Sequence, residues 1–104
     1  MTVYVYKFEG QRPKLFTQAY PSPWHGLTAD TVEELHSFAE LLGLSRQFYR
    51  PLRSDGVETP LVGHYELAPG ERDRAVKNGA KPITMREHKK MLRQQAAPFG
   101  IKLD

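Results

Sequence analysis

The clearest helix signal in the chain lies at residues 28–43, TADTVEELHSFAELLG. Its apolar residues recur at helical spacing, and they are Val32, Leu35, Phe38, Ala39 and Leu42. Asp30 or Thr31 can cap this helix, because a glutamate lies three residues after each of them, as a capping box requires. Gly43 is suited to end the helix in a left-handed turn. We therefore predict a helix over residues 28–43.

Predicted strands and helices alternate on both sides of this helix. Residues 2–8, TVYVYKF, are β-branched or aromatic and predict a strand. The other predicted elements are a weaker strand at 11–20, a helical turn at 45–49, a loop at 51–60, a strand at 61–67, a helix at 69–78, a strand at 81–83 and a helix at 84–95. This alternation predicts an α/β fold, a small two- or three-layer domain with a short, mostly parallel sheet and about three helices.

The length and composition of the chain limit the class of protein. Its 104 residues are typical of one domain, so we predict a single α/β domain over 1–104 with a frayed tail at 96–104. The absence of cysteine excludes a disulfide scaffold, a cysteine-ligated metal and a thiol nucleophile. The sequence has no signal-peptide pattern and no membrane-span pattern, which predicts a cytoplasmic, soluble protein without a membrane partner. We expect a monomer or a homodimer.

Positive charge is concentrated in the last third of the chain. Residues 1–70 carry 6 Lys/Arg and 8 Asp/Glu, a net charge of −2, whereas residues 71–104 carry 9 and 4, a net charge of +5. The last predicted helix has a basic face formed by Arg86, Lys89, Lys90 and Arg93. His88 lies between these cations in the sequence. Such a face is typical of a surface for nucleic acid or another anion, or of a helix side that is simply solvated. No aromatic residues are interleaved with these cations.

Three polar residues at the start of the first helix are candidates for chemistry. Asp30, Glu33 and His36 follow one another at three-residue steps and are neighbours on a helix surface. A carboxylate beside an imidazole can bind a divalent metal, which makes Asp30 and His36 candidate metal ligands, or can orient a general base. The alternative is structural, with the carboxylates capping the helix and His36 flanking the core. There is no Gly-rich phosphate loop and no GxSxG or HExxH motif, so we expect no cofactor.

A second group of polar residues lies where the 61–67 strand meets the next helix. His64 and Tyr65 are consecutive in a strand, so they point to opposite faces. Arg72 lies early in the following helix, where a cation opposes the helix dipole and therefore needs a carboxylate or a bound anion. The catalytic candidates are His36, His64 and Asp30. The ligand-binding candidates are Trp24, His25, His36, His64, Tyr65 and Arg72.

In a parallel sheet, ligands bind beyond the carboxyl ends of the strands. The residues that follow Phe8, Leu67 and Ile83 would then share one edge. We therefore expect the imidazoles and the guanidinium of the two polar groups to approach one cleft.

Two motifs resemble those of a known family. They are E-L-H-x-F-A-x-x-L-G-L at residues 34–44 and H-Y-E-L-x-P-x-x-R at residues 64–72. The chain from Trp24 to Ala80, with the opening strand, is similar to the bacterial and phage proteins catalogued as domain of unknown function four thousand and thirty-one. The resemblance implies a fold and a site region but no activity. Members close the first strand with an acidic pair, where this chain has Tyr6 and Lys7, and place a histidine where this chain has Gly26.

These observations support two hypotheses of function. The first is a phage-type or bacterial binding module for a host or cellular protein or an anionic ligand, nucleic acid included. The alternative is a hydrolase or nuclease-like enzyme with His36 or His64 as base, Asp30 as orienter or metal ligand and Arg72 holding a phosphate. The missing carboxylate and the displaced histidine favour the binding module, because losing one member of a polar constellation lowers affinity or rate strongly.

Overall fold

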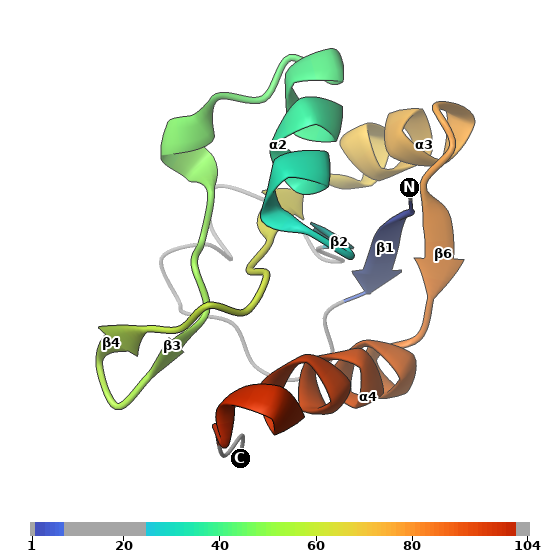
Figure 1. Ribbon diagram of the computed structural model, residues 1–104. Coiled ribbons are helices and arrows are strands. Elements are labelled where there is room, and N and C mark those ends of the chain that lie inside the picture. Colours follow the sequence, from blue (N-terminus) through green and yellow to red (C-terminus); the bar gives the residue numbers. More distant parts are fainter. Residues whose placement is uncertain (1, 8–24, 102–104) are drawn as a thin grey trace, which may run out of the picture.

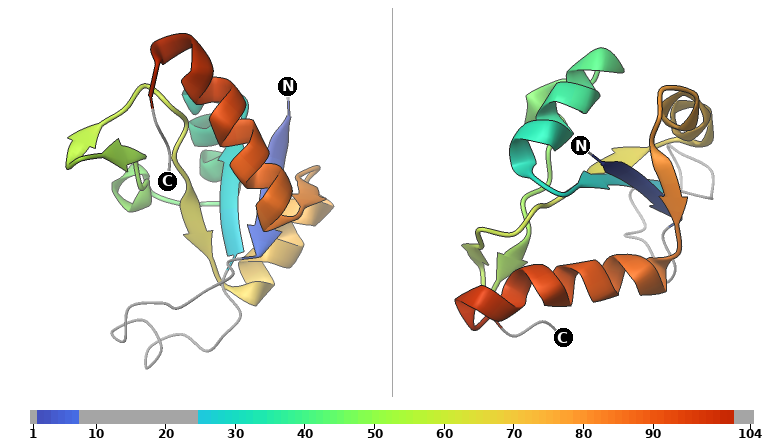
Figure 2. Two further views of the ribbon diagram at one scale, coloured as in Figure 1. Left: turned by 90° about the horizontal axis from the view of Figure 1, so that it is seen from below. Right: turned by 45° about the vertical axis from the view of Figure 1, so that its right-hand side comes forward.

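A sheet between two helical layers makes up the fold. The computed structural model describes residues 2–7 and 25–101. In order, the strands are β1 (Val3–Lys7), β2 (His25–Ala29), β3 (Arg53–Ser54), β4 (Val57–Glu58), β5 (Tyr65–Leu67) and β6 (Lys81–Ile83). The helices are α2 (Val32–Leu41), α3 (Pro69–Lys77) and α4 (Met85–Ala96), with 3-10 turns at Arg46–Phe48 and Ala97–Phe99. Helices α2 and α3 cover one face of the sheet and α4 the other, so the predicted α/β class is confirmed in its three-layer form (Figures 1 and 2).

The main sheet is mixed, so the prediction of a mostly parallel sheet is wrong. Its strand order is β5-β2-β1-β6, and only the β1–β6 pair is parallel. The reason is β2, which runs antiparallel between β1 and β5. Thr28 and Ala29, which the predicted helix over 28–43 includes, belong to β2. Pairing with strands on both sides makes them strand instead.

Although the sheet is mixed, three strands still end at one edge. Because β2 is antiparallel to both neighbours, β1 and β5 run in the same direction, and β6 is parallel to β1. The register sets Lys7 opposite His25, and His25 opposite Leu67. The carboxyl ends of β1, β5 and β6 and the start of β2 therefore lie along the same edge.

Helix α2 begins later than predicted, at Val32. Thr31 is the N-cap, and its hydroxyl accepts a hydrogen bond from the Glu34 backbone N–H at 3.2 Å. The carboxylate of Glu34 does not complete a capping box, because it accepts a bond from the Thr2 backbone N–H at 3.1 Å. The start of α2 is thereby tied to the start of β1. Gly43 adopts the left-handed conformation that was predicted, with φ of 81°.

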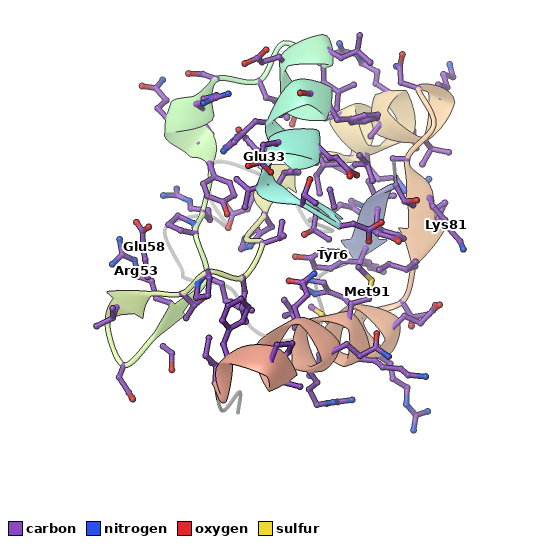
Figure 3. All side chains as sticks on the ribbon, viewed as in Figure 1. Tyr6, Glu33, Arg53, Glu58, Lys81 and Met91 are labelled. Carbon is purple, nitrogen blue, oxygen red and sulfur yellow. The ribbon has the colours of Figure 1, made fainter. Side chains whose placement is uncertain are left out.

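The remaining predicted helices and strands within the described residues agree in type and differ in extent, whereas the predicted loop does not agree. The loop at 51–60 contains the β3–β4 hairpin, where Arg53 and Glu58 pair at 3.6 Å (Figure 3). The strand predicted at 61–67 is regular only at 65–67, and His64 forms an isolated bridge with Arg50. Part of the predicted frayed tail forms the 3-10 turn at 97–99. The strand predicted at 11–20 and Trp24 lie outside the described residues. Within those residues, none of the helices has the length and apolar character needed to cross a bilayer.

Both faces of the sheet are covered, and they differ in character. The face under α2 and α3 is apolar, and its buried strand residues are Val3, Val5, Leu27, Ala29, Tyr65 and Leu67. Leu35 of α2 and Ala75 of α3 join this core. Alternation along the strands places Tyr6, Gly26 and Glu66 on the opposite face, toward α4.

Candidate functional site

The dipeptide His64-Tyr65 divides the predicted site residues between the two faces of the sheet. Tyr65 is 1% exposed and belongs to the core under α2. His64 is half-buried on the α4 side, where its Nε2 lies 4.0 Å from Oε1 of Glu66. The sequence suggested that one of the two would face the core, but both are covered because the sheet lies between two layers.

The first cluster, which we call the His36 cluster, consists of His36, Tyr49 and Tyr65. Nδ1 of His36 and the Tyr65 hydroxyl are hydrogen-bonded at 2.7 Å. The ring of Tyr49 meets the imidazole edge-on, with centroids 4.8 Å apart, and its hydroxyl accepts a bond from the Gly63 backbone N–H at 2.8 Å. Burial and the Arg46 charge lower the pKa of His36 below its ordinary value. This cluster joins α2 to the sheet.

The second cluster, the α4-side cluster, consists of Tyr6, His64, Glu66 and His88. Tyr6 and His88 stack with centroids 3.9 Å apart and planes inclined by 17°. In Figure 3, Tyr6 lies between the sheet and α4. His64 Nε2 and Glu66 Oε1 are 4.0 Å apart, but burial and the Arg50 charge outweigh that carboxylate and lower the pKa of His64 to about 4. Burial, with the His64 charge, lowers the pKa of His88 to about 4.

One buried polar atom in the α4-side cluster is unsatisfied. His88 is 8% exposed, and its Nδ1 has no hydrogen-bond partner among the described residues. Leaving such a group unpaired costs roughly 1–3 kcal/mol. The face of His88 is nevertheless well packed, because its ring covers the Tyr6 ring. The Tyr6–His88 stack therefore contributes to holding α4 against the sheet.

Comparison with known proteins identifies the family. The model of a family described as protein of unknown function, DUF4031, matches residues 15–95. The chain belongs to the DUF4031 family. The resemblance seen in the two sequence motifs is thereby confirmed. No curated protein and no solved structure matches the chain.

Tyr6 and Gly26 of this DUF4031 chain are neighbours in space. Tyr6 and Gly26 are register partners on adjacent strands. A Cβ atom at Gly26 would lie 2.3 Å from Cζ of Tyr6, so the tyrosine ring occupies the space above the glycine. The large residue on β1 thus requires the small residue on β2.

The described part of this DUF4031 protein does not bring His36, His64 and Arg72 to one cleft. Arg72 lies on α3, on the face of the sheet opposite α4, and its Nη1 is 3.4 Å from Oδ1 of Asp73. His64 is on the α4 side, and His36 is bonded to Tyr65. The carboxylate that Arg72 was predicted to need is therefore supplied by its own helix. His36 and His64 therefore lie on opposite faces of the sheet, with Arg72 on the α3 side.

The other candidate residues have local partners. Asp30 accepts a bond from the Tyr4 hydroxyl at 3.0 Å. His25 is the half-buried first residue of β2, and Trp24 lies outside the described residues. Within residues 2–7 and 25–101, no three His, Asp or Glu side chains gather in a way that could hold a metal. Asp30 and His36 therefore have no third ligand of this kind in that part of the chain.

The outer side of α4 carries a distinct charged surface, which we call the basic face. All four of its side chains are exposed, and within the described residues none forms an ion pair: Arg86, Lys89, Lys90 and Arg93. By contrast, Arg46 and Arg53 each lie 3.6 Å from a glutamate oxygen. His88, which lies among the four in sequence, points into the molecule instead.

The sequence alone did not predict that Tyr6, Glu66 and His88 form a cluster. A signal was present, because Tyr4 and Tyr6 alternate with Val3 and Val5, and a strand with two bulky faces is covered on both sides. The position of His88 on the side of its helix opposite the cations was a second signal. Only the strand order, however, places Tyr6 and Glu66 on the two strands that flank Gly26 of β2.

Proposed function

We propose that this protein is a binding module that holds an anionic macromolecule on the basic face of α4. The observation that carries the proposal is four exposed cations on one helix face without carboxylate partners in the described chain. Cations that are not neutralised within the fold attract phosphate or carboxylate groups of a partner. We place this activity in the cytoplasm of a bacterium or in a phage-infected cell.

The position of α4 supports this role. Its inner side rests on the sheet through His88, while Thr84 and Glu87 form a reciprocal capping box at its start, with both hydrogen bonds at 3.0 Å. The helix is therefore held in one orientation with its cations outward. A preformed surface of this kind loses little conformational entropy when a partner binds.

An enzyme of the His/Asp/Arg type receives no comparable support. Such an enzyme needs a base, an orienting carboxylate and a phosphate-binding guanidinium around one substrate. Here Asp30 bonds to Tyr4, His36 to Tyr65 and Arg72 to Asp73. The geometry thus favours binding over catalysis.

The test is binding of the full chain to heparin and to duplex DNA over a range of salt concentrations. We expect affinity to fall steeply with salt, and Lys89→Gln with Lys90→Gln to reduce the slope of log K against log salt by about two. The matched control is Arg46→Gln with Arg53→Gln, which removes the same charge from paired positions and should leave binding nearly unchanged. The proposal would be refuted if the protein bound neither polyanion at low salt. It would also be refuted if both double variants lost the same amount of binding affinity.

A further inference from the structure

We propose that the partner of the basic face is double-stranded nucleic acid, with α4 lying in its major groove; this inference rests on the proposed function. Among the described residues, α4 is the only helix on its side of the sheet, and it forms an outer ridge in the right-hand view of Figure 2. With side chains, an α-helix is about 10–12 Å across, and the major groove of B-DNA is about 12 Å wide. A ridge formed by one helix can therefore enter that groove.

The order of the cations around the helix fits this placement. With about 100° of rotation per residue, Arg86 and Arg93 differ by only about 20° and lie along the middle of the basic face. Lys89 and Lys90 then fall on opposite sides of that line. In a groove-bound helix, the two arginines face the floor and the two lysines face the phosphate walls.

The residue types suit those two environments. A guanidinium can donate two parallel hydrogen bonds to O6 and N7 of guanine, the commonest specific contact in the major groove. Lysine acts as a flexible point charge and suits phosphate. Neither lysine has a carboxylate partner in the described chain. Both can therefore form ion pairs with the phosphates that line the groove.

Other anionic partners fit α4 less well. A single strand is normally held by stacking its bases on aromatic rings, and α4 contains no aromatic residue other than the buried His88. A membrane-binding helix inserts an apolar side into the bilayer, but the inner side of α4 is occupied by the sheet through the Tyr6–His88 stack. The duplex is the partner that needs neither feature.

The experiment compares three probes with the full chain: a 20-base-pair DNA duplex pool with a randomised centre, the same pool as single strands, and heparin. We expect the duplex to bind roughly tenfold or more tightly than the single strands, and selected duplexes to be enriched in guanine. Arg86→Lys with Arg93→Lys keeps the charge but loses the two-point contact. It should abolish that enrichment and leave the salt dependence unchanged. Arg46→Lys with Arg53→Lys is the matched control and should keep the enrichment.

The outcomes separate the two proposals. Equal binding to duplex, single strands and heparin would refute the duplex partner and leave the anion-binding function standing. Enrichment that survives in the Arg86→Lys, Arg93→Lys variant would also refute the groove geometry. Absence of binding to all three probes at low salt would refute both. Because the four positions are exposed, unchanged melting temperatures of the variants would show that folding is not the cause.

Discussion

Position 26 is one of two described glycine positions, with Gly63, where an added methyl group would meet neighbouring atoms at less than 3 Å. We expect Gly26→Ala to lower the free energy of unfolding by about 1–3 kcal/mol, because its Cβ would lie 2.3 Å from Cζ of Tyr6. Tyr6→Ala removes the ring, so in that background the added cost of Gly26→Ala should largely disappear. Urea denaturation of the four proteins of this double-mutant cycle measures the coupling.

Gly63 provides the control for this cycle. A Cβ there would lie 2.0 Å from the Arg50 carbonyl oxygen, which is backbone and cannot be moved by shortening a side chain. Gly63→Ala should therefore destabilise the protein whether residue 6 is tyrosine or alanine. Equal costs of Gly26→Ala in both backgrounds would show that the Tyr6 ring is not the obstacle.

His88 makes stability depend on pH. Its pKa is about 4 in the folded protein, below the ordinary value of 6.5, so the unfolded chain binds a proton that the folded protein does not. Stability is fully present above pH 6.5 and is lost as the pH falls from 6.5 to about 4, with His88 contributing on the order of 2–3 kcal/mol. His64, with its pKa also about 4, acts in the same direction.

The variant His88→Phe tests this assignment. Phenylalanine can keep the stack on Tyr6, carries no titrating group and leaves no buried nitrogen without a partner. We expect the free energy of unfolding to fall less steeply between pH 6.5 and 4 than in the wild-type protein, and to be no lower at pH 7. Denaturant titrations at several pH values provide the measurement, and identical pH profiles for the two proteins would contradict the role of His88.

At the scale of the elements, α3 begins with an incomplete cap. The Glu71 carboxylate accepts a bond from the Ala68 backbone N–H at 2.9 Å, but Ala68, the N-cap, has no side-chain acceptor to return one. Ala68→Ser supplies the hydroxyl and should stabilise the protein by roughly 1 kcal/mol. For a chain of this size, that corresponds to a rise of roughly 4–8 °C in melting temperature. Ala68→Val, which has no acceptor, is the control, and an equal or lower melting temperature for the serine variant would contradict the prediction.

At the scale of the whole molecule, the layers should differ in how easily they open. Strands β1 and β2 are each hydrogen-bonded on both sides, whereas α3 buries one of its nine residues and α4 two of its twelve. We expect native-state hydrogen exchange to be slowest in β1 and β2 and faster in both helices, which would open without global unfolding. Protection in α4 equal to that in β2 would show that the outer layer is not independent.

Local features of this protein were predictable from its sequence. The Thr84 and Glu87 capping box, the left-handed Gly43 and the exposed cations of α4 each depend on residues a few positions apart. A cap, a glycine turn or a helix face needs only its own neighbours to form. The two motifs that suggested the family are also short and can be read from neighbouring residues.

The tertiary structure alone decided the order of the strands and the division of the polar residues. Residues 25–29 became strand because β1 and β5 flank them, although Thr28 and Ala29 resembled a helix start. That antiparallel strand sets Tyr6 beside Gly26 and separates His64 from His36. Pairing between segments distant in the chain depends on which hydrogen bonds and packed surfaces form together, and no local pattern along the sequence encodes that choice.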